Sequence, residues 1–242
     1  LTLPCLAAAP RCGYSLCAVQ QEKQVGPMAL SEPVKREAMH TRRIEVQGFL
    51  REDGLLDVDA RLVDTKPYSF ANDDSGEIPA GRPLHEMLVR MTVDEKLVIT
   101  ACEAVTLHSP YAECGGGADN MGVLVGLALK AGFIKAANER LRGALGCTHI
   151  REMLQQIATV AHQTMWPVRE RARARQLAEE QRADPSRIVR AEPGADDGSI
   201  RLLNTCFAYA STGAVVRKRW PHLATATTTL AAPQPVVADE VS

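Results

Sequence analysis

Apolar and polar residues alternate between residues 40 and 64, as they do in a β-hairpin with one buried face. Ile44 and Val46 mark a first strand, and a second strand runs from Leu56 to Val63. The intervening Glu52-Asp53-Gly54 predicts the turn, because an Asp-Gly pair accepts the positive φ angles of a tight hairpin. Alternation along the second strand places its aspartates on a solvated face.

Two further runs of strand character extend from Leu84 to Asp94 and from Leu97 to Leu107, with a short turn at Asp94-Glu95. A polar loop rich in Asn, Asp, Gly and Pro precedes them at residues 69–83. So short a connection between two strands suits antiparallel neighbours. The N-terminal half therefore predicts an antiparallel sheet of about four strands.

The pattern changes to a helical period after Gly146. Apolar residues recur there at spacings of three and four, which marks one face of an amphipathic helix. Thr148 is the expected N-cap, since its hydroxyl can accept from unpaired backbone N–H groups. We expect Trp166-Pro167 to stop this helix and a second, solvated helix to run from Arg169 to Glu180. The apolar stripe consists of Ile150, Met153, Leu154, Ile157 and Ala161.

These patterns predict an α+β fold in a single domain, residues 40–221, in which C-terminal helices pack on the sheet. A Pro/Gly/Asp-rich stretch near residues 184–199 is expected to be a polar linker inside this domain. Residues 1–39 lack the pattern, and we interpret them as a disordered or mis-assigned N-terminal extension. Residues 222–242 are rich in Ala, Thr, Pro and Val and are predicted to form a disordered tail.

Composition narrows the class of protein. The chain is 45% hydrophobic and 24% charged, which suits a soluble protein with a sizeable core. A net charge of −1 and only 4% aromatic residues argue against nucleic-acid binding. Charged residues interrupt the apolar segments, so no membrane span is predicted. Nothing in the composition specifies an oligomeric state.

Cysteine usage points to a compartment. Seven cysteines, an odd number spread along a long chain, do not form the disulfide framework of a small secreted domain. A reducing cytoplasm in which some cysteines serve as ligands or thiols fits better.

Gly146-Cys147-Thr148-His149 is the stretch with the clearest chemical potential. Cys147 and His149 flank the predicted helix start, where the positive end of the helix dipole favours a thiolate. A thiolate and an imidazole one residue apart can face one point only where the backbone is not yet helical. The pair therefore suits a ligand or thiol site, although the same two residues also fit an inert buried cysteine beside a surface histidine.

Five segments spread over residues 40–221 match the motifs of one known family: His40-Thr41-Arg42-Arg43-Ile44, Arg51-Glu52-Asp53-Gly54-Leu55, Leu62-Val63-Asp64-Thr65-Lys66, Gly146-Cys147-Thr148-His149, and Thr205-Cys206 with Val215-Val216-Arg217. Together they resemble the bacterial family called domain of unknown function 2889. The family name brings no biochemical function with it.

The resemblance draws attention to three cysteines. Family members carry a Pro-Tyr-x-x-Cys segment, matched by Cys114, the Gly-Cys-x-His segment of Cys147 and His149, and a late cysteine, matched by Cys206. A histidine or another polar residue commonly follows the late cysteine in the family. Phe207 follows it here, which removes one further ligand.

Cys114, Cys147, His149 and Cys206 would make a Cys₃His set, and such a set suits tetrahedral zinc or an iron–sulfur centre. The first hypothesis is therefore a cytoplasmic protein that binds zinc or an iron–sulfur cluster. The second is a scaffold or carrier of metal or clusters without catalysis. The third is a metal-free thiol enzyme with Cys147 as nucleophile and His149 as base. The sequence leaves open whether the protein is an enzyme, and it indicates no substrate.

Overall fold

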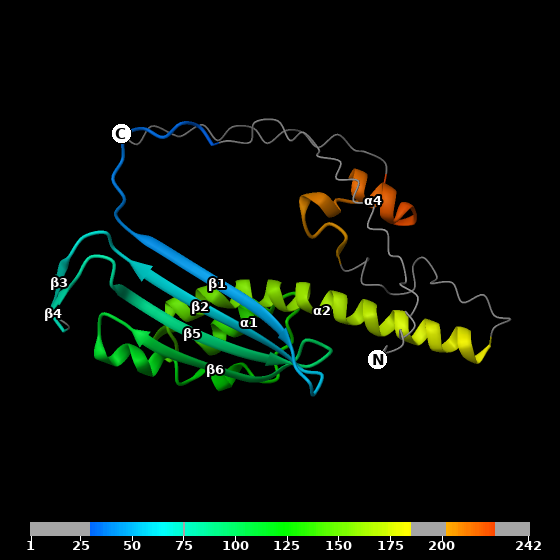
Figure 1. Cartoon of the computed structure of the whole chain (residues 1–242), viewed down its shortest axis with the longest axis horizontal. Helices are drawn as coiled ribbons and strands as arrows, with labels where there is room; N and C mark the ends of the chain where they lie inside the picture. The colour runs from blue at the N-terminus through cyan, green and yellow to red at the C-terminus, as the bar shows by residue number, and fades with distance from the viewer. Residues whose placement is uncertain (1–29, 75, 185–201, 226–242) are drawn as a thin grey trace, which may run out of the picture. The chain divides into compact units, whose positions relative to one another are not determined.

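A four-stranded antiparallel sheet forms the centre of the computed structural model, which describes residues 30–74, 76–184 and 202–225 (Figure 1). Helices follow the sheet along the chain, so the predicted α+β class and the antiparallel sheet in the N-terminal half are confirmed. The strands lie in the order β1-β2-β5-β6, with bounds β1 Thr41–Leu50, β2 Leu56–Thr65, β5 Pro83–Val93 and β6 Ile99–His108.

The first hairpin has the predicted strands and turn. Its register runs from Thr41 opposite Thr65 to Leu50 opposite Leu56. Gly54 in the turn has φ +84, the left-handed conformation that a glycine adopts without steric cost. Local alternation and turn chemistry together were sufficient to define this pair of strands.

The second hairpin is also where the sequence predicts it. Asp94 organises the turn, because its Oδ1 accepts from the backbone N–H groups of Lys96 and Val98 at 2.9 and 2.8 Å. The loop before β5 contains a small two-stranded sheet, β3 Phe70–Asn72 and β4 Gly76–Ile78, that the sequence did not predict. Strands of three residues are too short to show an alternating pattern.

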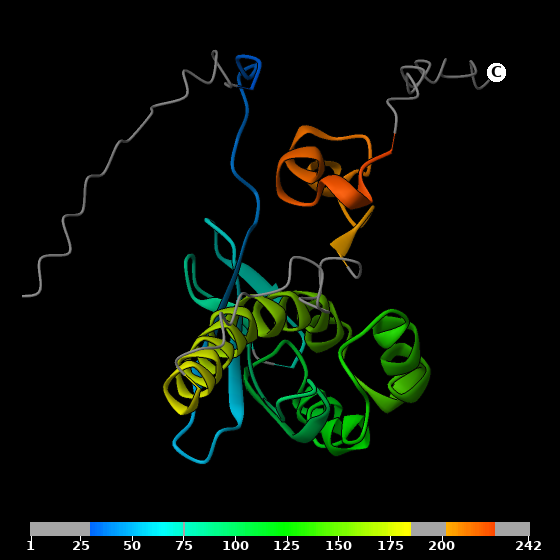
Figure 2. The same ribbon diagram turned by 90° about the vertical axis from the view of Figure 1, so that its right-hand side faces the viewer.

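Helix α2, Thr148–Ala183, packs on β1, β2 and β5 and is much longer than expected (Figures 1 and 2). The prediction that Pro167 ends the helix is wrong, and the second predicted helix is the continuation of α2. A proline inside a helix removes one backbone hydrogen bond, here to the carbonyl of Gln163. Met165 is buried and Val168 packs against the core. Apolar contacts on both sides of Pro167 thus favour a continuous helix.

The start of α2 also differs from the prediction. Cys147 is the N-cap, with φ −86 and ψ 134, and no side chain caps this end of the helix. Thr148 is already the first helical residue, one position too late for its hydroxyl to act as the expected N-cap.

The core lies between the inward face of the sheet and α2. Buried residues alternate along β2 and β5, and those of α2 follow the predicted stripe. Strand β1 approaches the helix closely at Gly48, where an added Cβ would lie 2.1 Å from Oγ1 of Thr164. The largest fully buried side chains include Leu56, Leu62, Met87, Met91, Ile99, Leu124, Ile150, Met153, Leu154 and Ile157.

Short helical segments connect β6 to α2. They are η1 Ala112–Gly117, η2 Met121–Leu124, α1 Phe133–Arg140 and η3 Gly143–Leu145. Met121, Leu124, Phe133 and Ala137 bury their side chains in the core, so these segments close one end of it.

Residues 202–225 form a further short helical segment. It contains η4 Phe207–Tyr209, α4 Ala214–Arg219 and η5 Pro221–Leu223. Within it, the rings of Tyr209 and Trp220 lie 5.6 Å apart.

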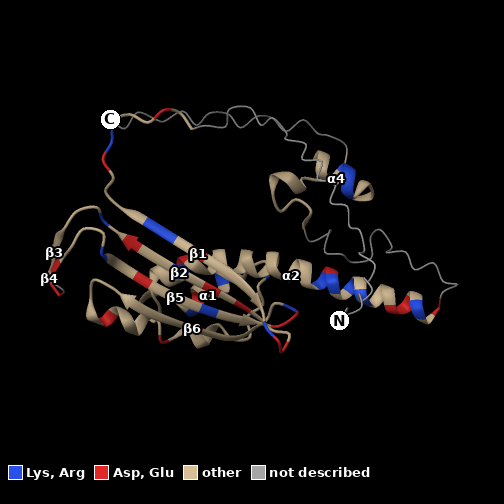
Figure 3. Cartoon of the chain, in the orientation of Figure 1, with Lys and Arg blue, Asp and Glu red and all other residues tan. Residues whose placement is uncertain are grey.

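The predicted extension, linker and tail fall mostly outside the described residues: 1–29, 185–201 and 226–242 are not described. Within the described ranges, no helix combines the length and apolar character needed to cross a bilayer. Figure 3 shows that charges gather on the second half of α2, where no residue is buried.

Candidate functional site

A row of three polar side chains crosses the helix-covered face of the sheet. Arg42, Asp64 and His85 are direct cross-strand partners on β1, β2 and β5. Cross-strand partners lie side by side on one face, so the register alone brings them together. Asp64 is completely buried (0% exposed), and its carboxylate therefore requires charged or hydrogen-bonding partners.

Arg42 is the principal partner of Asp64. Its Nε donates to Oδ1 at 2.8 Å and its Nη2 donates to Oδ2 at 2.7 Å, which is the bidentate geometry of a strong ion pair. Nη1 of Arg42 pairs with Glu152 on α2. Nε2 of His40 lies 3.3 Å from Oδ1 of Asp64. The buried carboxylate thus connects the sheet to the first turns of α2.

Two further histidines approach the other oxygen of Asp64. Nδ1 of His85 lies 3.0 Å from Oδ2, and Nε2 of His149 lies 3.8 Å from the same oxygen. The rings of His85 and His149 stack with centroids 3.9 Å apart and planes tilted by 32°. Stacking and the shared carboxylate together restrict the orientation of the His149 ring.

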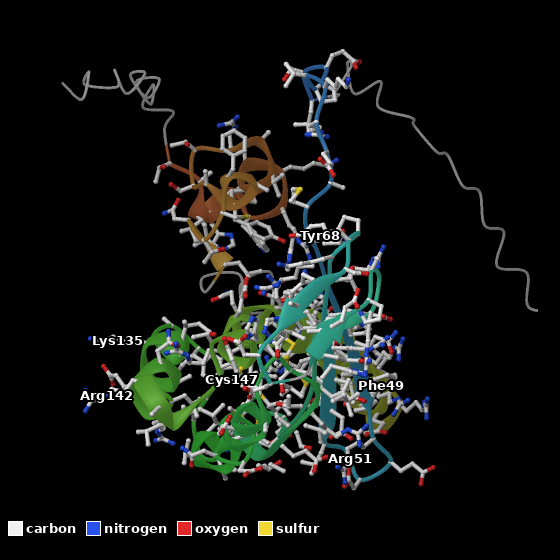
Figure 4. The ribbon with its side chains drawn as sticks, turned by 90° about the vertical axis from the view of Figure 1, so that its left-hand side faces the viewer. Phe49, Arg51, Tyr68, Lys135, Arg142 and Cys147 are labelled. Carbon is white, nitrogen blue, oxygen red and sulfur yellow. The ribbon has the colours of Figure 1, made fainter. Side chains whose placement is uncertain are left out.

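Cys147 contacts the other side of His149. Its Sγ lies 3.7 Å from Nδ1 of His149, and the side chain is half-buried against the core. Figure 4 shows Cys147 on the side of the sheet that carries the helical segments. Gly117 of η1 packs on it, since a Cβ there would lie 3.1 Å from Cβ of Cys147. A continuous series of contacts therefore runs from Cys147 through His149 to Asp64.

The surroundings of Asp64 favour its ionised form. Burial opposes ionisation, but the hydrogen bonds and positive charge of Arg42, with a smaller contribution from His40, outweigh it and lower the pKa of Asp64 to about 2. Asp64 is therefore a carboxylate throughout the physiological pH range.

Both stacked histidines are shifted toward the neutral form. Burial lowers the pKa of His85, and the neighbouring His149 lowers it further. Burial also lowers the pKa of His149, with Arg42 as the next contributor. A neutral imidazole can accept a proton or bind a metal, whereas an imidazolium can do neither.

Asp64, His85 and His149 form an arrangement that could hold a metal ion. One ligand atom from each residue lies within 4.8 Å of the other two. The three residues come from β2, β5 and α2. Of the predicted ligands, this arrangement includes only His149.

The predicted Cys₃His residues are placed as follows. Cys147 and His149 are in contact, as the spacing suggested. Cys114 is half-buried in η1, and Cys206 is exposed at the start of η4. In the described part of the chain, neither cysteine joins a group of three or more ligands around that pair. The Cys₃His set stays a prediction. Cys102 packs against the core, and burial raises the pKa of its thiol to about 12.

Asp64, Arg42 and His85 are residues of the site that the sequence did not predict. A usable signal existed. Once the three-residue turn Glu52-Asp53-Gly54 sets Arg51 opposite Leu55, counting back along both strands places Arg42 opposite Asp64. The distance between β2 and β5 in the sequence hides the pairing with His85.

The comparison with protein families bears on these residues directly. The model of a protein of unknown function (DUF2889) matches residues 40–163, just over half of the chain. The chain belongs to the DUF2889 family. The match spans β1 through the first half of α2, and so contains Arg42, Asp64, His85, Cys147 and His149. No curated protein and no solved structure matches the chain significantly.

DUF2889 is a family without an assigned biochemical role, so membership leaves the chemistry to be argued from the site. The matched region ends before Cys206 and includes Cys114. The matched region also contains every residue of the cluster around Asp64, which consists of Asp64 with His40, Arg42, His85, His149 and Glu152.

Proposed function

We propose that this DUF2889 protein is a thiol-dependent enzyme, with Cys147 as nucleophile, His149 as general base and Asp64 as the group that orients His149. One observation carries the proposal: the two ring nitrogens of His149 face different partners. Nδ1 lies 3.7 Å from the thiol of Cys147, and Nε2 lies 3.8 Å from the carboxylate of Asp64. Nucleophile, base and acid in this order define the triads of hydrolases on unrelated folds.

The proton positions required for catalysis agree with the surroundings. In the neutral tautomer with hydrogen on Nε2, His149 directs this N–H toward Asp64, an electrostatic contact at 3.8 Å, and presents the free lone pair of Nδ1 to Cys147. Nδ1 then takes the thiol proton while Sγ attacks an electrophilic carbonyl carbon. The leaving group departs with that proton and a thioester remains on Cys147. Water, activated by the same nitrogen, hydrolyses the thioester and restores the thiol.

The helix start supplies a site for the negative charge that develops on the carbonyl oxygen. Cys147 is the N-cap of a 36-residue helix, and no side chain caps that end. The first backbone N–H groups of an α-helix have no intrahelical partner. Those of Thr148 and the next residues directly follow Cys147 in the chain and are available as backbone donors to an oxyanion.

Arg42 and His85 act as positioning residues. Arg42 keeps Asp64 ionised and fixed through two hydrogen bonds, and His85 stacks on the ring of His149. Their contacts reach Asp64, Glu152 and His149. Their removal is expected to misplace the base without removing the nucleophile.

The helix start adjoins a shallow, open depression lined by Asn138, Thr148, Arg151 and Glu152. Open access suits a carbonyl group presented at the surface of a larger or extended substrate better than a small molecule that must be enclosed. The proposed substrate class is therefore an ester, thioester or amide that reaches Cys147 from this side.

Alkylation of the full-length protein tests the proposal. The protein is treated with iodoacetamide at neutral pH, and the rate at each cysteine is measured by mass spectrometry of its peptides. Cys147 is expected to react at least about tenfold faster than the same residue in His149→Gln, because a base that accepts the thiol proton typically contributes this much or more. His108→Gln is the matched control, because His108 pairs with Glu86, outside the cluster around Asp64.

Portions of the same protein preparations that have not been alkylated then receive p-nitrophenyl acetate. An acetyl group on Cys147 that disappears with time is expected, together with release of nitrophenolate that Cys147→Ser abolishes. Equal alkylation of Cys147 in wild type and His149→Gln, or no acetylation of Cys147, would contradict the proposal.

A second candidate function is metal binding by Cys147 and His149 with Cys114 and Cys206, as a zinc or iron–sulfur protein or as a carrier. It is favoured by the 3.7 Å contact between Cys147 and His149 and by the packing of Gly117, three residues after Cys114, on Cys147. Anaerobic purification followed by zinc and iron analysis tests it. Metal that Cys114→Ser and Cys206→Ser both lose supports this ligand set, and metal that both retain excludes it.

A further inference from the structure

The group formed by Asp64, His85 and His149 has the composition of a different metal site. Two imidazoles and one carboxylate are the protein ligands of many zinc and non-haem iron centres. All three side chains are anchored on regular elements, β2, β5 and α2. Ligands on rigid elements hold their geometry better than ligands on loops.

The spacing of the ligand atoms is close to that of a coordinated ion. Bonds of 2.0–2.2 Å at tetrahedral angles separate neighbouring ligand atoms by about 3.4 Å. Oδ2 of Asp64 lies 3.0 Å from Nδ1 of His85 and 3.8 Å from Nε2 of His149. These two values lie on either side of the required distance, and the third pair of ligand atoms lies within 4.8 Å, so shifts of roughly 1 Å would complete the site.

Arg42 donates to Oδ2 of Asp64, the oxygen that would bind the ion, but Arg42 also has other partners. Nη2 of Arg42 bonds Oδ2 of Asp64, while Nε bonds Oδ1 and Nη1 already pairs with Glu152. Loss of the single contact to Oδ2 leaves the other two in place. Arg42 and His40 would then orient the carboxylate through Oδ1, as groups behind a metal ligand commonly do.

We propose that Asp64, His85 and His149 bind one divalent cation of the zinc type, and that the bound ion switches off the chemistry of Cys147. The second part rests on the proposed function, whereas the first does not. A neutral imidazole that binds metal through Nε2 must carry its proton on Nδ1. Nδ1 then faces Cys147 as a donor, and His149 can no longer take the thiol proton. Metal binding and base catalysis therefore exclude each other at one ring.

Zinc titration of the metal-stripped full-length protein tests the site. Competition with a chromophoric chelator is expected to give one tight equivalent of zinc. His85→Gln is expected to weaken its binding at least about tenfold, because one of three protein ligands is lost. Gln retains a donor toward Asp64, which limits damage to the fold, and circular dichroism checks that the variant is folded. His108→Gln, the matched control, is expected to bind zinc as wild type does.

Alkylation of Cys147 is measured in parallel, with and without one equivalent of zinc. Zinc is expected to slow the reaction at least about tenfold in wild type and in His108→Gln, and to have much less effect in His85→Gln. Cobalt(II) reports the ligands independently. A thiolate-to-cobalt charge-transfer band that Cys147→Ser abolishes would make Cys147 a ligand and overturn the assignment of Asp64, His85 and His149 as the protein ligands.

The outcomes separate the two proposals. One equivalent of zinc that depends on His85, with a Cys147 that His149 does not activate, supports the ion site and rejects the thiol enzyme. An activated Cys147 with no tight zinc, or with zinc binding that His85→Gln leaves unchanged, rejects the ion site alone.

Discussion

Arg42 and Asp64 face each other across adjacent strands and form a bidentate ion pair in which the carboxylate is completely buried. Removing one partner of such a pair is strongly destabilising, because the remaining charge has no access to water. The pair is therefore a structural requirement of the site as well as an electrostatic one.

The first prediction concerns this ion pair. Arg42→Met should lower the free energy of unfolding by about 2–4 kcal/mol at pH 7, since it leaves Asp64 buried without its main partner. Arg51→Met is the matched control, because Arg51 pairs with Asp53 and Asp57 at an exposed position. That variant should lose much less stability, because an exposed ion pair contributes little. Urea denaturation measures the free energy of unfolding of both variants. Equal losses would show that the buried pair contributes no more to stability than the exposed one.

The second prediction concerns stability in acid. The pKa of Asp64 is lowered from 3.8 to about 2 in the folded protein. A group with a lowered pKa stabilises the fold above its unfolded pKa, and this contribution is lost as pH falls through the folded pKa. Asp64 should therefore contribute about 2 kcal/mol at neutral pH and lose it between about pH 4 and pH 2. Urea denaturation at several pH values measures the decline, which should be shallower in Asp64→Asn.

The third prediction concerns the stacked histidines. The pKa values of His85 and His149 are lowered below 6.5 in the folded protein. Below pH 6.5 the unfolded chain binds protons that the folded chain excludes, so stability should fall as pH drops below about 6.5. His85→Gln should reduce this slope. Equilibrium unfolding between pH 7 and pH 5 measures how the free energy of unfolding changes with pH. The same dependence in wild type and His85→Gln would contradict the role of His85 in it.

The fourth prediction concerns the contact between Gly48 and Thr164. An alanine Cβ at position 48 would lie 2.1 Å from Oγ1 and 2.9 Å from Cβ of Thr164, and rotation of so short a side chain cannot relieve both contacts. Gly48→Ala should cost about 2 kcal/mol, as overpacking in a core does, and adding Thr164→Ala should recover part of it. Gly122→Ala, where an added Cβ meets open space, should be close to neutral in the same denaturation assay.

Local patterns in the sequence were enough to predict the four strands. In each hairpin the strands are separated by a short turn with its own chemistry, at Asp53-Gly54 and at Asp94, so local signals define the pairing. The length of α2 was not predictable in this way. Its continuation through Pro167 depends on apolar contacts with the core, which no local rule about proline includes.

The candidate site was predicted only in part for a similar reason. Cys147 and His149 are two residues apart, and their contact follows from the local backbone at a helix start. Asp64 and His85 reach them only through the register between β2 and β5 and the packing of α2 on the sheet. The spacing of residues along the chain therefore does not reveal the carboxylate of Asp64 as a partner of His149.

Gly48 has a consequence for the chemistry as well as for packing. The close approach of β1 to Thr164 fixes where α2 lies along the sheet, and His149 is 15 residues earlier on the same helix, about 22 Å away. A displacement of α2 by one helical turn, about 5.4 Å, would separate His149 from Asp64 entirely. The absence of a side chain at position 48 thus helps to hold His149 in line with Asp64 in the proposed triad. Substitutions at position 48 should therefore alter the reactivity of Cys147 without changing any reacting group.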